Sequence, residues 1–592
     1  MQQGRMAISG GMLAQRARLW WFAASRGLLT IVARINALPL VRWASFPITA
    51  DRLLIAPQDL RTADPTRANE LYAGRFAFAG KIVICEGRSP FQMEPPSLEW
   101  ADVLLGFGWL RHLRAAENNL ARANARALVA DWMARQGAWN GLGWRPEIVA
   151  RRIISWLCQA PLVLQETDVT FYRRFLRNLT RQVRYLRRTV SCTRDGLPRL
   201  QAIIALTYAS LCMEGQARWL KPLSKRLVDE LERQVLPDGG HISRNPGALI
   251  ELLLDLLPLK QAFAHRNVAP PAALLNAIDR MMPMLRFFRH GDGNFALFNG
   301  MGPTAPELLA TVLAYDDARG APLANAPHSG YQRLQADGLL VLMDTGRPPA
   351  LTASQEAHAG CLAFELSSKQ NRIVVNCGLP AISRDSWRPV ARATPAHSTV
   401  TFNGESSAQF AVSSAFRRLF GAPLYSGPTE VPVNRQDRDH ALVVRASHDG
   451  YAARFGVLHQ RSLRLAADGS RFDGEDVFAP ATGDVIPSNR RDEFAVRFHL
   501  HPSVRVNRLA DGHGVMLLLP NQELWTFSAY EDQAELEESV YLAGPEGPRR
   551  AVQIVIYGRA RAVSRVRWTF AQVDSESRAA APEAVPEIDP MA

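Results

Sequence analysis

Cysteine is sparse in this chain of 592 residues, and no two cysteines form a CxxC pair. The 6 cysteines lie far apart, most of them inside apolar segments. A free cysteine in such a setting behaves as a small hydrophobic residue. This distribution excludes the disulfide framework of a small secreted domain, and zinc-finger spacing is missing as well.

Lysine is also nearly missing, since the chain has 5 lysines against 64 arginines, which suggests a bias in codon composition. The net charge is nevertheless +13, with a pI near 9.8. A basic surface suits an anionic partner, such as a uronic-acid polysaccharide or an anionic lipid. The charge is spread along the chain without a Lys/Arg block, so no nucleic-acid partner is predicted.

Acidic residues and long apolar runs are both missing from the first fifty residues. This segment holds six arginines, and the first acid is Asp51. Its apolar clusters, at 19–22 and 28–32, stay short of the ~18 residues that a membrane span requires. Neither a continuous apolar region nor a cleavage site typical of a signal peptide is evident. Residues 1–70 are therefore interpreted either as a basic amphipathic segment on an anionic membrane or as a helix packed on the protein body.

The rest of the chain has the composition of a soluble globular protein with two or more domains. From residue 71 to 330, apolar residues recur at spacings of three and four between short Gly, Pro or Asn breaks. Near Tyr331 the period changes to two, and short segments separated by Asp-Gly turns continue to residue 570. The sequence predicts a helical domain at 71–330, an antiparallel β-sandwich at 331–570 and a disordered tail at 571–592.

Individual elements are predicted from the same periodicity. The predicted helices cover residues 115–135, 146–159, 169–188, 200–213, 218–234 and 248–263. The predicted strands cover residues 339–344, 362–366, 373–375, 399–402, 441–446, 496–501, 515–519 and 553–557.

Three polar side chains between Gln355 and Val400 lie at predicted strand ends. His358 opens one strand, Asn376 closes the next, and His397 precedes a third. Alternation places the apolar residues of each strand on one buried face, so these polar side chains could converge on a metal ion or an anionic substrate. Simple solvation of strand ends is the alternative.

The order of motifs in this stretch, QEAHAGCLAFELSSKQNRIVVNCG and then ARATPAHSTVTFNG, resembles the β-domain of the heparinase II/III-like polysaccharide lyases. Upstream, PPSLEWADVLLGFGWLRHL (95–113), GWRPEIVARRIISWL (143–157) and PDGGHISRNPGALIELLLDLLPL (237–259) look like the helical domain of that family. The resemblance implies an (α/α) toroid followed by a β-sandwich, with a cleft between them. It also implies that the protein is located in the cell envelope or periplasm. The cytoplasm is the alternative location, because no clear signal peptide is evident.

The activity implied by the resemblance is β-elimination on a uronic-acid-containing chain, either heparin/heparan-like or alginate-like. Such a lyase neutralises the uronate carboxylate, removes the C5 proton with a base and protonates the leaving oxygen with an acid. No cofactor is required. The resemblance implies that Asn245 contacts the carboxylate, and Arg244 and His241 lie beside it near a helix N-terminus, which also attracts anions. The alternative is that Asn245 or Ser243 only caps the helix.

The sequence departs from the family at the proton-transfer residues. The loop RHGDGNFALFNGMG (289–302) lacks the tyrosine expected there, and Asn299 occupies its approximate place as a substrate-binding candidate. His290 and Tyr315 are possible substitutes. Glu356 replaces the first of two histidines expected in the β-domain, and Arg392 could contact an anionic sugar or form a surface ion pair. The candidate catalytic residues are Asn245, His358, His397 and Tyr315.

A structural divalent metal such as zinc is a further candidate, with His358, Asn376 and His397 as ligands. Two imidazoles and one carboxylate suit zinc, whereas asparagine in place of the family's aspartate removes a charge. A hydrogen-bonded cluster is therefore the alternative. His499 and His501 alternate on one strand face and could form another ligand pair, or they could simply be satisfied strand histidines.

Two rival functions keep the same fold. A non-catalytic glycan-binding or envelope-biogenesis protein would explain both the missing tyrosine and Glu356. A glycoside hydrolase needs two cleft carboxylates; Glu251 and Asp255 lie one helical turn apart, but their apolar setting favours support of a helix face. The predicted partner is an anionic polysaccharide. Peripheral membrane contact through the N-terminal segment is an alternative, and the oligomeric state is not predicted.

Overall fold

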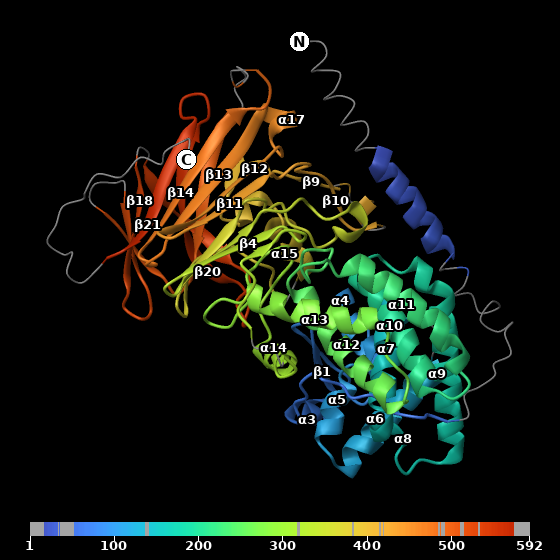
Figure 1. Ribbon diagram of the computed structural model, residues 1–592. Helices are drawn as coiled ribbons and strands as arrows, with labels where there is room; N and C mark the ends of the chain where they lie inside the picture. Colours follow the sequence, from blue (N-terminus) through green and yellow to red (C-terminus); the bar gives the residue numbers. More distant parts are fainter. Residues whose placement is uncertain are drawn as a thin grey trace.

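The computed structural model describes residues 17–32, 35, 52–135, 141–316, 320–381, 384–411, 413, 416–417, 420–483, 486, 492–509, 514–530 and 533–573. Helices fill the N-terminal half of this part of the chain and antiparallel strands the C-terminal half (Figure 1). From residue 574 onward, the tail predicted to be disordered lies outside the described residues, as do the first 16 residues.

The helical domain is built from amphipathic helices joined by short loops. Its main helices are α4 (Leu98–Gly106), α6 (Asn119–Arg135), α7 (Pro146–Cys158), α9 (Val169–Thr189), α10 (Leu197–Cys212), α11 (Leu220–Gln234), α12 (Gly247–His265), α13 (Ala272–Phe287) and α14 (Pro306–Leu313). Helix α10 is buried along most of its length and packs against α7, α11 and α12. A helix with so little polar surface belongs at the centre of a domain. The domain is therefore organised around α10.

The C-terminal domain is a sandwich of two antiparallel sheets. The first sheet has the order β19-β20-β15-β7-β6-β5-β4-β3, with β8 also paired to β15, and the second has the order β11-β12-β13-β14-β21-β18-β17-β16. The strands of the first sheet that matter below are β4 (Tyr331–Ala336), β5 (Leu339–Asp344), β6 (Phe364–Ser368), β7 (Asn371–Val375), β8 (Val400–Phe402) and β15 (Glu493–Leu500). The other strands of the first sheet are β3 (Asn325–Ala326), β19 (Ala534–Tyr541) and β20 (Arg549–Arg559). The strands of the second sheet are β11 (Val433–Arg438), β12 (Ala441–His448), β13 (Val457–Ala466), β14 (Arg471–Pro480), β16 (Arg505–Arg508), β17 (Gly514–Leu518), β18 (Leu524–Ala529) and β21 (Arg565–Gln572).

The first sheet is covered on both faces. In β5 all six residues are buried, and alternate side chains enter different cores. Leu340 and Leu342 belong to the core of the helical domain, whereas Leu339, Val341 and Met343 belong to the core between the two sheets. Because strand side chains alternate between faces, one strand serves two cores at once. The toroid and the sandwich thus share this sheet.

The N-terminal helix (residues 17–32, with Ile35 also helical) lies at the edge of the molecule and is drawn in blue in Figure 1. Phe22 and Ala23 are buried, and Arg26 Nη1 donates a hydrogen bond to the carbonyl of Thr193 at 3.3 Å. Within the described residues, no helix is both long enough and apolar enough to cross a membrane.

Candidate functional site

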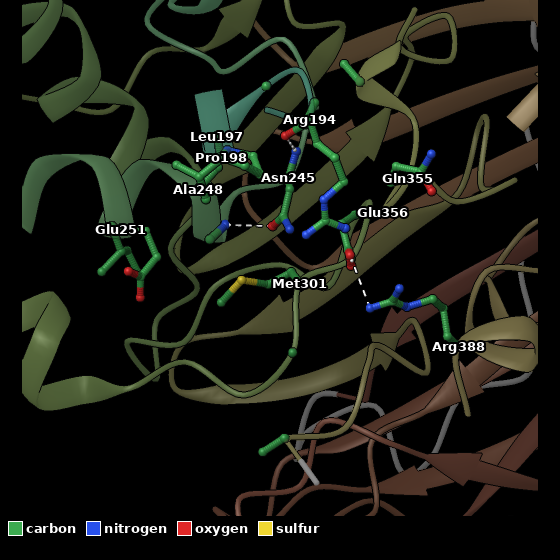
Figure 2. A pocket seen from close by; sticks show the side chains of 18 of the residues that line it. Arg194, Leu197, Pro198, Asn245, Ala248, Glu251, Met301, Gln355, Glu356 and Arg388 are labelled. Atoms are coloured by element: carbon green, nitrogen blue, oxygen red, sulfur yellow. Dashed lines mark hydrogen bonds and ion pairs between the residues drawn. The ribbon is translucent and has the colours of Figure 1, made fainter. Parts of the chain in front are cut away.

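A cavity of about 610 Å³ opens between the helical domain and the loops of the sandwich. Its walls come from loops and helix starts that are far apart in the sequence: Glu99, residues 194–198 before and within α10, Ser243, Asn245, 247–248 and 250–251 at the start of α12, 300–303, Ala305, Leu308, 352–353, 355–356, 380–381 and Arg388. Figure 2 shows the side chains of this cavity, with Asn245, Arg194 and Glu356 near its centre. We call it the interdomain cleft.

Asn245 lines the interdomain cleft at the point where α12 begins. Its Oδ1 accepts a hydrogen bond from the Gly247 backbone N–H at 2.9 Å, so one end of the amide serves the helix start. The other end, Nδ2, points away from α12 and toward the cleft, where Arg194 and Glu356 also lie (Figure 2). The amide can therefore support the helix start and also donate a hydrogen bond to a ligand, so the two roles weighed as alternatives for Asn245 are compatible.

Two arginines and a glutamate complete the polar lining near Asn245. Arg388 pairs with Glu356 at 3.2 Å (Figure 2), and Arg194 pairs with Glu147 at 3.3 Å while its side chain stays 51% exposed. Guanidinium groups are suited to binding carboxylates because they offer parallel N–H donors. Neither arginine was predicted, because Arg194 comes from the loop before α10 and Arg388 from the short helix α15 (Arg384–Ala391), and neither sequence carries a motif.

Arg244 does not line the interdomain cleft, although it was predicted to bind substrate beside Asn245. It takes a left-handed backbone conformation (φ 60°), and its guanidinium is buried. The guanidinium donates to the carbonyls of Ser329, Gly330, Gly346 and Arg347 and pairs with the buried Asp344. Arg244 therefore fastens the start of α12 to the sandwich.

His241 and Asn299 are also buried in structural contacts instead of facing the cleft. The His241 ring contacts Ser243 Oγ at 2.7 Å and Gln234 Oε1 at 3.0 Å, and burial lowers its pKa to about 4. Asn299 Nδ2 donates to the Tyr331 hydroxyl and to Asp344, while its Oδ1 accepts from the backbone N–H of His358 at 3.1 Å. Both placements differ from the predicted substrate contacts because the polar groups are used within the protein.

His358 and His397 meet, as their positions at strand ends suggested, but they bond to each other. His358 Nδ1 lies 3.0 Å from His397 Nε2, and His397 Nδ1 lies 2.9 Å from the Ala393 carbonyl. A carbonyl can only accept, so His397 Nδ1 carries a proton. Burial lowers the pKa of His397 to about 4, so the ring is neutral and its Nε2 accepts from His358.

These side chains do not fit a divalent metal. Asn376 Nδ2 donates to Glu365 at 3.1 Å and its Oδ1 accepts from the Ser398 backbone N–H at 3.0 Å, so the amide is committed to its own sheet. Within the described ranges, no group of three or more His, Cys, Asp or Glu side chains could hold a metal ion. The geometry shows the alternative to a zinc site, which is a hydrogen-bonded cluster that includes His358 and His397. His499 is also bonded within the protein, to Ser539 and the Pro395 carbonyl.

The remaining candidates lie away from the cleft. His290 is buried, with contacts to Ser367 Oγ at 2.8 Å and Glu365 Oε2 at 3.0 Å. Tyr315 follows α14 and packs half-buried against the helical core. Arg392 was predicted to contact a sugar or a surface acid, but it is 3% exposed and donates to three backbone carbonyls. None of the three lines the interdomain cleft.

Glu251 and Asp255 form an ion-pair network with two arginines. Arg61 contacts Glu251 at 2.9 Å and Asp255 at 2.8 Å, and Arg151 contacts Asp255 at 3.1 Å. Burial opposes ionisation, but the charges of Arg61 and Arg151 lower the pKa of both carboxyls. A hydrolase needs one carboxylic acid with a raised pKa. This pair therefore supports the helix, as its setting in the sequence suggested.

The family of the chain follows from its similarity to known proteins. Residues 318–569 match the family model described as heparinase II/III-like, C-terminal. Over 534 residues the chain is 32% identical to FtsZ-localized protein C of Caulobacter vibrioides, which covers 88% of this chain and 90% of that relative. The chain therefore belongs to the heparinase II/III-like family, which confirms the resemblance noted in the sequence.

Solved structures show the same fold. A mutant of the heparan sulfate lyase HepC from Pedobacter heparinus aligns with a TM-score of 0.60 and 16% identity, covering 94% of this chain and 89% of that chain. Heparinase III aligns with a TM-score of 0.64 and 13% identity, covering 83% and 79%. The predicted order of helical toroid and β-sandwich is thus confirmed.

Proposed function

We propose that this protein binds an anionic, uronic-acid-containing polysaccharide in the interdomain cleft without cleaving it. The observation that carries this proposal is the composition of the cleft. Among the described residues that line it, Asn245, Arg194 and Arg388 can bind carboxylates, but no histidine or tyrosine is present. β-Elimination needs a base for the C5 proton and an acid for the leaving oxygen.

Of the four acids that line the described cleft, Glu356, Glu251 and Asp195 are poorly suited to replace those groups; the fourth is Glu99. Glu356 is held by Arg388, and Glu251 by Arg61. Burial alone would raise the pKa of Asp195, but hydrogen bonds from Arg233, Thr352 and the Gly196 N–H lower it to about 2. A carboxylate that is stabilised in its ionised form is a weak base and no proton donor near neutral pH.

Paired measurements of binding and product formation test this proposal. We expect the protein to bind an alginate-like or heparan-like polyuronate and to release no unsaturated product with ultraviolet absorbance, even at high protein concentration. Asn245→Asp keeps an oxygen that can accept from Gly247 but places a negative charge where the amide donates. This variant should weaken binding at least ~10-fold. Steady accumulation of the unsaturated product would show a lyase, and equal binding by the variant would remove Asn245 from the site.

We further propose that this protein acts at the cell envelope, beside the division apparatus. FtsZ-localized protein C is the relative that supports this location. The N-terminal helix adds a specific observation, because its exposed apolar side chains lie on one face. This face holds five residues at spacings of four, four, three and four: Trp20, Ala24, Leu28, Ile31 and Ile35. The exposed fractions are 73% for Trp20, 63% for Leu28, 54% for Ile31 and 51% for Ile35. Such a face suits a helix that lies in the plane of a membrane surface.

A further inference from the structure

Helix α9 carries seven arginines and no acidic residue. Five of them, Arg173, Arg177, Arg181, Arg184 and Arg188, follow one another at spacings of four, four, three and four residues. Residues at these spacings lie along one face of a helix. At a rise of 1.5 Å per residue, this row extends over about 22 Å. We call these five residues the arginine stripe.

The arginine stripe is the outer face of α9, because the opposite face is packed into the toroid. Phe175, Leu179 and Leu186 on that opposite face are fully buried. In contrast, Arg173, Arg177 and Arg181 are exposed, and within the described part of the chain they form no ion pair with an acid.

Further positive charge gathers at the C-terminal end of the stripe. Arg187 lies 4.0 Å from the centre of the Trp219 ring, beside Arg218. Burial, followed by the charges of Arg184, Arg218 and Arg188, lowers the pKa of Arg187. The arginines thus repel one another at this end of α9, and an anionic ligand would relieve that repulsion.

The same end of α9 lies next to the N-terminal helix. A short turn (Val190–Cys192) leads from α9 to Thr193, whose carbonyl accepts the hydrogen bond from Arg26. The N-terminal helix exposes Trp20 and Trp21 with exposed fractions of 73% and 78%. Tryptophan is enriched where proteins meet the interface of a membrane. An apolar surface with tryptophans therefore adjoins a row of arginines.

We propose that the arginine stripe binds the phosphate headgroups of an anionic lipid surface while the N-terminal helix inserts its apolar face beside it. This inference rests on the proposed membrane contact and adds a second, electrostatic site on another element. Guanidinium groups bind phosphate oxygens through parallel N–H donors. The adjoining apolar face favours a lipid surface over a polysaccharide, because its exposed aliphatic side chains Leu28, Ile31 and Ile35 can enter an acyl layer, which a polysaccharide does not offer.

Sedimentation of the full chain with vesicles tests the stripe. Vesicles of phosphatidylcholine alone are compared with vesicles that also contain phosphatidylglycerol. Each basic residue close to an anionic surface contributes about 1 kcal/mol, so Arg173→Gln, Arg177→Gln and Arg181→Gln together should weaken binding to the anionic vesicles about 100-fold. The matched control removes three exposed arginines of the sandwich, Arg505, Arg559 and Arg565, and should leave binding unchanged.

The other outcomes separate this inference from the proposals on which it rests. Wild-type binding by the α9 variant overturns the stripe, and the membrane contact then stands if Trp20→Ser with Trp21→Ser abolishes binding. An equal loss in the sandwich control reduces the effect to net charge and also overturns it. If the α9 variant loses polyuronate binding while vesicle binding persists, the stripe serves the polysaccharide instead. A Lys replacement at the same three positions should keep most of the vesicle binding, which excludes misfolding as the cause.

Discussion

Replacing Arg244 should loosen the attachment of the toroid to the sandwich. Its buried guanidinium is shared among four backbone carbonyls and Asp344, which is itself 2% exposed. Removing one partner of a buried ion pair costs about 3–5 kcal/mol, because the other charge stays buried. Each carbonyl left without a donor adds roughly 1 kcal/mol. We therefore expect Arg244→Ala to lower the free energy of unfolding by at least about 4 kcal/mol.

Urea unfolding followed by tryptophan fluorescence measures this effect, and limited proteolysis shows whether the two domains separate. The free energy of unfolding of Arg244→Lys should lie between those of the wild type and Arg244→Ala. The lysine ammonium keeps the positive charge, but it lacks the planar set of N–H donors with which the guanidinium binds several carbonyls. Arg347→Ala removes an exposed arginine nearby and serves as the matched control. If Arg244→Ala and Arg347→Ala unfold at the same urea concentration, the reasoning about this contact is wrong.

Three further predictions concern other parts of the molecule. Burial lowers the folded-state pKa values of His241 and His397 from 6.5 to about 4, so between pH 6.5 and 4 only the unfolded chain binds a proton on each of these rings. As the pH is lowered through that window, the free energy of unfolding should fall by up to about 1.4 kcal/mol per pH unit for each group. His397→Gln should reduce this dependence of the free energy of unfolding on pH. Dialysis against a chelator should leave the unfolding midpoint unchanged, and stoichiometric release of zinc would contradict the hydrogen bond between the His358 and His397 rings. Trp20→Ser with Leu28→Ser should weaken vesicle sedimentation without changing polyuronate binding; unchanged sedimentation would argue that the N-terminal helix only packs on the protein.

Hydrophobic periodicity predicted six helices of the toroid and eight strands of the sandwich, but it missed other strands, including the ten-residue β13 and β14. The strand predicted at 339–344 coincides with β5, and the helix predicted at 169–188 ends one residue before α9 does. The strand predicted from Leu362 begins two residues later, because Leu362 has a left-handed backbone conformation (φ 60°). The later start of this strand depends on the backbone conformation of one turn, which the alternation of apolar residues cannot predict.

The candidate site was harder to predict, since side chains that are neighbours in sequence serve different purposes. Asn245 faces the interdomain cleft, whereas Arg244 points into the seam between the domains. The positions of His358 and His397 at predicted strand ends were enough to predict that the two side chains lie close together. These positions did not predict the hydrogen bond between the two rings. Arg194 approaches the cleft from a loop and Arg388 from the helix α15, and only the packing of the two domains brings them together.

The sheet shared by two cores has a consequence for how a ligand reaches the cleft. Opening the cleft like a hinge would draw Leu340 and Leu342 of β5 out of the helical core and expose them to water, while Arg244 would leave its carbonyls. Interfaces that allow domains to rotate are small and polar, unlike this one. We therefore expect the gap between the domains to keep its width, so that the proposed polysaccharide would enter a slot that is already open.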